Sequence, residues 1–238
     1  MNVREIEYEV DGTVFAGQLH AGDGPRPAVA VCHAWGGRDA FTCDVAGRLA
    51  GLGYAGFAMD VYGKGVRGGT VAENQALMRP LVEDRARLGR RLAAGIDALR
   101  AQPEVDATRV AAIGYCFGGL CVLDLARAGA DLRGVVSFHG LLIPAEGLPD
   151  RPVRSPVLVL HGHDDPMVPP EQVLAFEREM TAAGADWQLH AYGGAVHAFT
   201  NPDARDRAAG AAHDAAADRR SWQAMRNFLE EVLAEPSS

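Results

Sequence analysis

The sequence lacks both a surplus of basic residues and any long apolar run. It carries 23 lysines and arginines against 31 aspartates and glutamates, which gives a formal net charge of −8 at pH 7. A chain with this balance repels phosphate backbones and anionic lipid surfaces, so we expect no nucleic-acid partner. The longest apolar runs, residues 28–32 and 157–160, are far below the roughly 20 residues that span a bilayer, so we expect no membrane segment.

Cysteine is scarce, and the sequence does not pair it. The chain has 4 cysteines and no C-x-x-C motif, which is typical of free thiols in a reducing compartment. The N-terminal residues 1–10 alternate polar and apolar side chains and lack the basic and apolar regions of a secretory signal, so they favour a strand. These two features predict a cytoplasmic protein.

What the sequence contains is an alternation of short β-rich runs with longer helical patterns. This rhythm predicts an α/β fold with a mostly parallel central sheet of about eight strands and helices on both faces. With 238 residues, 48% of them hydrophobic, and no composition break that marks a linker, residues 1–238 are predicted to form a single domain. The expected strands are residues 6–10, 14–20, 28–32, 55–59, 110–115, 134–138, 157–161 and 187–192, and the expected helices are residues 41–52, 73–101, 118–128, 170–183 and 212–233.

The first two expected strands differ in pattern from the six that follow. They alternate polar and apolar residues, so we place them at an antiparallel edge. The other six are short and apolar, as expected for strands covered on both faces. Farther along, the Ala/Asp/Arg-rich stretch 203–220 has mixed charges on an alanine background and is interpreted as a solvated helix.

The sharpest motif is the sequence GYCFGG at residues 114–119, which follows an expected strand and opens an expected helix. It has the G-x-C-x-G form of a nucleophile elbow, a tight turn that exposes its central side chain, here Cys116. The flanking glycines are needed because a Cβ there would collide with the neighbouring chain. The helix N-terminus favours a thiolate, so the motif predicts a nucleophile; the alternative is a buried structural cysteine beside a glycine-rich turn.

A nucleophile of this kind needs a base and a group that orients the base, in the chain order nucleophile, acid, histidine. Asp165 follows the seventh expected strand and His197 follows the eighth, so both lie with Cys116 at the carboxyl ends of parallel strands. The sequence thus predicts a Cys116, Asp165 and His197 triad. Asp164 competes with Asp165, which we favour from the placement of the turn that follows.

Acyl transfer also needs an oxyanion hole. The backbone N–H that follows the nucleophile, that of Phe117, supplies one donor, and a second is expected from the loop after the third strand. That loop reads CHAWGG at residues 32–37, and we assign the second donor to Ala34, with Trp35 as its neighbour. The alternative is an ordinary β-turn with a core tryptophan.

Together these motifs resemble the dienelactone hydrolase (carboxymethylenebutenolidase) family of α/β-hydrolases. The resemblance rests on residues 114–119, on G-x-x-D-x-x-V-P at 162–169, on HAF at 197–199 and on segments 33–37 and 53–63, so it covers nearly the whole chain. It implies an α/β-hydrolase fold, a Cys-His-Asp triad, and hydrolysis of a small-molecule lactone or carboxylic ester through an acyl-cysteine intermediate. This mechanism requires no cofactor and no metal, and we expect a monomer or a homodimer.

The chain departs from the family pattern at two places. His33 stands where the family carries a glutamate that interacts with the nucleophilic cysteine. Its imidazole either acts on the thiolate or a carbonyl, or is a structural histidine bonded to nearby backbone. In addition, no arginine follows His197 at once, although the family binds a substrate carboxylate with arginines, so the substrate need not be a dienelactone.

Five further side chains are expected to line the site: His33, Trp35, Tyr115, His139 and Phe199. For His139, which follows the sixth expected strand, the alternative is a satisfied structural histidine.

Other chemistries are weighed against this one. The sequence GKGVRG at 63–68 matches a dinucleotide-binding G-x-G-x-x-G, but no amphipathic helix begins at its third glycine, so we interpret it as a flexible active-site loop. The spacing of His161 and His163 is similar to that of metal ligands, but we do not expect a metal site there, because such neighbours on an extended segment point to opposite sides. A thiol-based redox sensor or non-catalytic binding protein on the same fold is the alternative to an enzyme.

Overall fold

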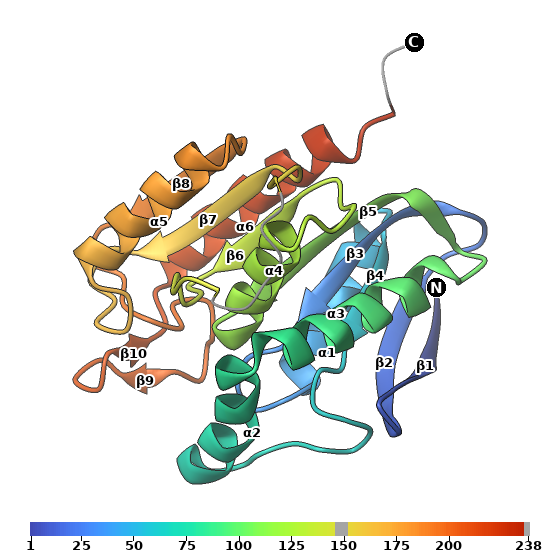
Figure 1. Ribbon diagram of the computed structural model, residues 1–238, viewed down its shortest axis with the longest axis horizontal. Helices are drawn as coiled ribbons and strands as arrows, with labels where there is room; N and C mark the ends of the chain where they lie inside the picture. Colours follow the sequence, from blue (N-terminus) through green and yellow to red (C-terminus); the bar gives the residue numbers. More distant parts are fainter. Residues whose placement is uncertain (146–151, 236–238) are drawn as a thin grey trace.

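The computed structural model describes residues 1–145 and 152–235, and an eight-stranded sheet forms its centre (Figure 1). Its strands are β1 (Asn2–Val10), β2 (Thr13–Ala21), β3 (Arg26–Cys32), β4 (Ala55–Met59), β5 (Val105–Tyr115), β6 (Val135–Phe138), β7 (Val157–Gly162) and β8 (Trp187–Tyr192). They lie in the order β1-β2-β4-β3-β5-β6-β7-β8. β2 pairs antiparallel with β1 and with β4, and every pair from β4 to β8 is parallel.

All eight predicted strands are confirmed, as is the antiparallel edge made by β1 and β2. The central strands are covered on both faces; β4, for example, is buried at every residue. β8 contradicts the prediction that it is covered on both faces, because its residues alternate between exposed and half-buried. It is an edge strand, and a hollow on each of its faces leaves it open to solvent. The hollow beside α5 is lined in part by Leu174 and Trp187, and the hollow beside α6 by His190 and Phe228.

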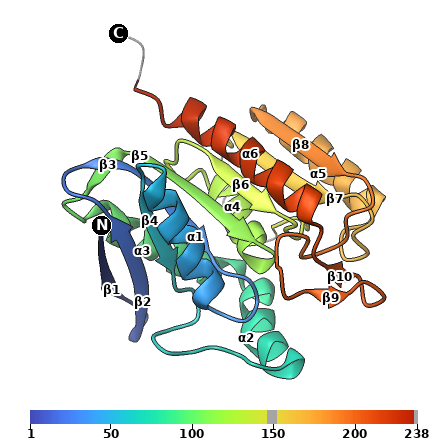
Figure 2. The ribbon, with the colours of Figure 1, turned by 180° about the vertical axis from the view of Figure 1, so that it is seen from behind.

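Helices cover both faces of the sheet (Figures 1 and 2). One face carries α3 (Arg85–Arg100), α4 (Phe117–Arg127) and α5 (Pro170–Ala182), and the opposite face carries α1 (Ala40–Gly51) and α6 (Ala215–Val232). α2 (Val71–Glu83) lies beyond the end of the sheet at which β5 ends (Figure 2). Within the described residues, no helix has the length and apolar character that crossing a membrane requires.

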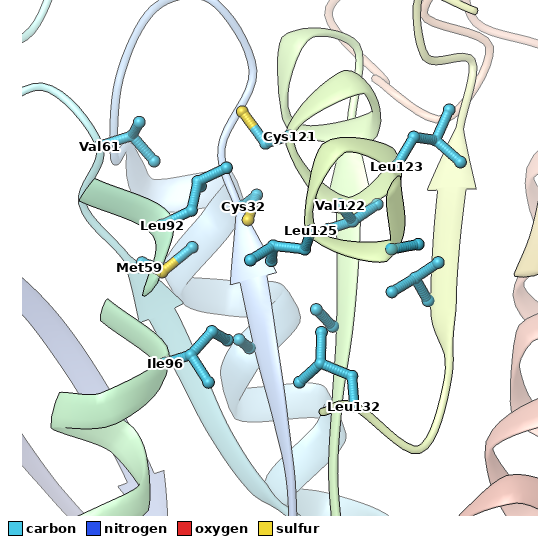
Figure 3. Packing of buried hydrophobic residues seen from close by; sticks show 14 of the residues in the cluster. Cys32, Met59, Val61, Leu92, Ile96, Cys121, Val122, Leu123, Leu125 and Leu132 are labelled. Carbon is cyan, nitrogen blue, oxygen red and sulfur yellow. The ribbon is translucent and has the colours of Figure 1, made fainter. Parts of the chain in front are cut away.

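Each central strand contributes to two hydrophobic cores, because successive side chains of a strand point to opposite faces. In β3, residues 28, 30 and 32 join the core beneath α3 and α4, whereas residues 29 and 31 join the core beneath α1 and α6. Figure 3 shows part of the first core, where Cys32 and Cys121 lie among aliphatic side chains. Burial raises the pKa of both thiols, as expected for packing residues rather than reactive ones.

The predicted helix over residues 73–101 is in fact two helices, α2 and α3, which are separated at Asp84. The Asp84 backbone leaves the helical region, with φ −121° and ψ 81°, and its side chain accepts a hydrogen bond from the Arg87 N–H. An aspartate in this position satisfies a backbone donor that the start of a helix leaves free. The chain can therefore change direction here and begin α3 on the sheet.

The predicted solvated helix over residues 203–220 is wrong in its first half. Residues 205–212 form a small antiparallel pair, β9 (Arg205–Asp206) and β10 (Ala211–Ala212), and α6 begins only at Ala215. Asp214 caps α6 by accepting hydrogen bonds from the N–H groups of Ala216 and Ala217. The preceding segment is held by bonds to distant residues, which are described with the site.

Candidate active site

The three residues predicted to form a triad lie at one edge of the sheet. Cys116 directly follows β5, Asp165 lies in the turn after β7, and His197 lies in the loop after β8. All three strands are parallel, so their carboxyl ends meet at this edge, where open α/β sheets build their sites. β6 separates β5 from β7, and the residue after it, His139, reaches the same edge.

Cys116 occupies a strained turn between β5 and α4. Its φ of 56° and ψ of −115° are unusual for a residue with a Cβ. A Cβ on Gly114 would lie 2.0 Å from the Gly118 carbonyl oxygen, and one on Gly118 would lie 2.1 Å from the Cys32 carbonyl oxygen. The turn therefore closes only with glycine at both places, as the motif predicts. Half-buried Cys116 stands at the N-terminus of α4, at the position predicted for the nucleophile.

Asp165 is hydrogen-bonded to His197, and both side chains are buried. The Nδ1 of His197 donates to the Oδ2 of Asp165 at 2.8 Å, while the Oδ1 of Asp165 accepts from the Met167 N–H at 2.8 Å. The backbone thus fixes one carboxylate oxygen, and the imidazole takes the other. Neighbouring Asp164 is exposed and faces Arg207 at 3.7 Å, so it makes no contact of this kind with the imidazole.

The pKa of His197 reflects two opposing effects. Burial alone lowers the pKa, but the hydrogen bond with Asp165, the nearby Cys116 thiol and the charges of both groups outweigh burial and raise it to about 10. Since Nδ1 is bonded to Asp165, Nε2 is the nitrogen left for the thiol. Among the described residues, Nε2 is buried and has no hydrogen-bond partner of standard geometry, a common state of catalytic pairs before substrate binds.

The segment that carries His197 is held by the residues around β9 and β10. The His197 N–H donates to the Gly210 carbonyl at 3.0 Å, and its carbonyl accepts from the Ala212 N–H at 3.1 Å. The next residue, Ala198, has a positive φ of 56°. These contacts join residues far apart in the chain, and the local composition of 203–214 does not reveal them.

The two residues predicted to form an oxyanion hole lie on adjoining segments. Phe117 is the first residue of α4, so its N–H is one of those without a partner inside the helix. The close approach of Gly118 to the Cys32 and His33 carbonyls packs the loop after β3, which includes Ala34, against the start of α4. In this loop the Gly37 N–H donates to the Ala34 carbonyl at 3.1 Å.

His33 is fully buried beneath this loop, and both of its ring nitrogens bond to backbone. Nδ1 donates to the Ala34 carbonyl at 2.7 Å, and Nε2 accepts from the Val61 N–H at 3.1 Å. An acceptor at Nε2 requires the neutral ring, in agreement with the lowering of its pKa by burial. Of the two alternatives for His33, these bonds support the structural one, because neither nitrogen is left for the thiolate.

The other residues predicted to line the site are mostly packed inside. Tyr115 stacks on Phe138, with ring centroids 4.5 Å apart, in the core beneath α1 and α6. Phe199 is fully buried, and its ring centroid lies 5.1 Å from that of His139. Trp35 is half-buried against the core beneath α3 and α4. His139 is buried directly beside His197, with ring centroids 5.2 Å apart, a contact that the motifs do not reveal.

The structure also describes the segments that carry the competing motifs. After GKGVRG the chain continues as a loop to Thr70, which caps α2, so no helix begins at the third glycine of that motif. In residues 1–145 and 152–235, no group of three or more His, Cys, Asp or Glu side chains is arranged to hold a metal ion.

Comparison with known proteins gives one matching family and several similar structures. The dienelactone hydrolase family matches residues 14–233. The chain is similar to the crystal structure of P91, a dienelactone hydrolase-like promiscuous phosphotriesterase from metagenomic libraries, with 41% identity, a TM-score of 0.93, and coverage of 98% of this chain and 99% of that one. A solved structure named m3DLH is 42% identical, with a TM-score of 0.92 and coverage of 98% and 99%. An uncharacterized protein of Caenorhabditis elegans is 42% identical over 147 residues, which are 60% of this chain and 93% of that protein.

The match covers all three strands whose carboxyl ends carry Cys116, Asp165 and His197. The parallel sheet with helices on both faces is that of α/β-hydrolases, as predicted. The resemblance read from the motifs is confirmed, and the chain belongs to the dienelactone hydrolase family.

Proposed function

We propose that the protein hydrolyses small carboxylic esters or lactones with Cys116 as the nucleophile, His197 as general acid and base, and Asp165 as the residue that orients His197. One observation carries the proposal. The buried Asp165 carboxylate holds Nδ1 of His197 at 2.8 Å, and the remaining ring nitrogen is left for a cysteine on a strained elbow. The buried Asp165–His197 pair and the strained backbone of Cys116 each have a free-energy cost that packing alone does not explain.

In acylation, the Cys116 thiolate attacks the carbonyl carbon, and the π electrons move to the carbonyl oxygen. The N–H groups of Phe117 and Ala34 stabilise the resulting oxyanion. As the intermediate collapses, the bond from carbon to the leaving oxygen breaks, and the His197 imidazolium donates its Nε2 proton to that oxygen. The products of this step are an acyl-cysteine thioester, a neutral imidazole and an alcohol. With a lactone, the alcohol remains part of the acyl chain.

In deacylation, the same imidazole acts as a base because its surroundings have changed. The thioester has consumed the thiolate, so the charge of Cys116 no longer raises the pKa of His197, while burial still lowers it. The neutral ring takes a proton from water, and the hydroxide attacks the thioester carbon. The thiolate then leaves, which frees the acid and restores the thiolate–imidazolium pair. No step requires a cofactor.

The test is steady-state hydrolysis of a dienelactone, a panel of activated short-chain esters and an activated phosphotriester. The phosphotriester is included because the similar structure P91 is described as a promiscuous phosphotriesterase. We expect ester or lactone turnover in the wild type and none above background in Cys116→Ala. The matched control is Cys43→Ala, since Cys43 is also half-buried but its thiol contacts Arg38 at 3.7 Å instead of a histidine.

Two outcomes contradict the proposal. Equal turnover in the wild type and Cys116→Ala would remove the cysteine from the mechanism. An inactive wild type whose Cys116 is still readily alkylated would instead favour the thiol-based sensor on the same fold. Where the wild type is active, the ratio of kcat/KM values for the dienelactone and the esters shows which substrate class the enzyme prefers.

A further inference from the structure

We infer that His139 is a positioning residue for His197, which it holds by ring contact and by a hydrogen bond to Thr200. This inference rests on the proposed function, because the group that it positions is the proposed acid and base. His139 directly follows β6, between the strands that carry Cys116 and Asp165.

The ring of His139 is enclosed by the site. It is 3% exposed and lies edge-to-face against His197, with centroids 5.2 Å apart and planes at 65°. On another side it meets Phe199 at 5.1 Å and 82°. Contacts of this geometry between aromatic rings are favourable and restrict both rings. Rotation of the His197 ring away from the line between Asp165 and Cys116 would therefore displace His139.

A hydrogen bond extends this contact to the backbone that carries His197. The Nε2 of His139 is 2.8 Å from the Oγ1 of Thr200, and both side chains are buried. Thr200 lies three residues after His197, beyond Ala198 with its positive φ of 56°. His139 thus connects β6 to both ends of the short turn that positions the imidazole.

Histidine is a costly choice for a residue that only fills space. The His139 backbone has a positive φ of 37°, a conformation that is unfavourable for a residue with a Cβ. Among the described residues, its Nδ1 is buried with no hydrogen-bond partner, unlike the two satisfied nitrogens of His33. A phenylalanine at position 139 with a valine at position 200 would fill the same space without leaving a buried polar atom unpaired. Costs of this kind gather at functional sites.

The ring also supplies its contact without charge. Burial first, and the neighbouring His197 second, hold the pKa of His139 well below its usual range. A neutral ring does not repel the imidazolium that forms on His197. Among the described residues, the titratable groups whose charges interact with His197 are Cys116, His139, His161 and Asp165.

The experiment compares three variants that separate the two contacts. His139→Phe keeps a ring but loses the bond to Thr200, His139→Gln keeps a polar group but loses the ring, and Thr200→Val removes only the hydroxyl. For each, kcat and KM are measured on the best ester, and the rate of iodoacetamide alkylation of Cys116 is followed against pH by peptide mass spectrometry. His190→Phe, the same change at an exposed position of β8, is the control.

We expect kcat to fall about 10- to 100-fold in both His139 variants, with KM nearly unchanged, because small misplacements of a catalytic group cost this much. The alkylation profile should move to higher pH, since a displaced imidazolium no longer stabilises the thiolate. Thr200→Val should move both readouts in the same direction by a smaller amount, and His190→Phe should move neither.

Unchanged kcat and unchanged alkylation profiles in the folded variants would overturn the inference. If the His139 variants do not fold, Thr200→Val decides alone, because it removes a single hydroxyl. A wild type without ester turnover would refute the proposed function, yet the alkylation profiles would still test whether His139 positions His197. If the wild type turns over the ester and the variants keep the wild-type kcat and alkylation profile, only the inference about His139 is refuted.

Discussion

Asp165→Asn should reverse the hydrogen bond that orients His197. Asp165 accepts from the Met167 N–H with one oxygen and from His197 Nδ1 with the other, each at 2.8 Å. Asparagine has only one oxygen, and the backbone N–H can only donate, so the oxygen stays on Met167. The amide NH₂ then faces Nδ1 and forces it to accept. The ring proton moves to Nε2, where it prevents the imidazole from taking a proton from the thiol or from water.

The size of the loss follows from this wrong tautomer. The same substitution in a serine-protease triad lowers kcat about 10⁴-fold. A thiol ionises far more readily than a serine hydroxyl, so the nucleophile here depends less on the base. We therefore expect kcat/KM to fall about 10²- to 10³-fold, which corresponds to roughly 3–4 kcal/mol of transition-state stabilisation. The loss of the Asp165 charge and hydrogen bond should also lower the pKa of His197, because both raise this pKa in the wild type while burial lowers it.

The assay is kcat/KM on an activated ester, with the alkylation of Cys116 measured against pH and the fold checked by thermal unfolding. Asp164→Asn provides the matched control, because the same chemical change falls on an exposed neighbour that faces Arg207. We expect the control to keep the wild-type rate and alkylation profile. A folded Asp165→Asn enzyme with the wild-type kcat/KM would refute the assignment of Asp165 and the tautomer argument with it.

Three further predictions concern the scaffold. Asp124→Ala should lower the free energy of unfolding in a urea titration by about 3–5 kcal/mol, because it leaves Arg85 and Arg127 buried without the carboxylate between them. Glu83→Ala, which breaks an exposed pair on α2, is the control and should leave that free energy nearly unchanged. Gly118→Ala should yield little folded protein on expression, since its Cβ would lie 2.1 Å from the Cys32 carbonyl oxygen; a variant with the wild-type melting temperature would show that the loop after β3 can move aside. Asp214→Ala should cost about 1 kcal/mol through loss of the cap of α6, with an unchanged kcat/KM; no change in urea stability would mean that the cap contributes nothing.

The sheet and the triad order could be predicted because their signals are local. Short apolar runs bounded by glycine, proline or aspartate mark strands, and the elbow at Cys116 requires glycines that no other residue replaces. Asp165 and His197 follow from the order in which this fold places its acid and base. Even the choice of Asp165 over Asp164 agrees with the bond to His197, since only one of two adjacent carboxylates can face inward from such a turn.

The remaining features depend on contacts between distant residues. The hairpin of β9 and β10 is held by the Gly210 and Ala212 bonds to His197. The local sequence does not show these bonds, and its alanine-rich composition alone predicts a helix. The break at Asp84 did carry a local signal, because a helix over residues 73–101 is longer than most and contains an aspartate able to cap a second one. His139 carries no motif, and only the structure shows its ring against His197.

The central claim is that the acyl group passes through Cys116, and rapid acid quench with intact-protein mass spectrometry tests it most directly. The enzyme is mixed with an activated ester, quenched within the first turnover and digested for peptide mapping. The account predicts one acyl group per chain, on the peptide that contains Cys116, and none in Cys116→Ala. Turnover without an adduct on Cys116, together with full activity in Cys116→Ala, would contradict it.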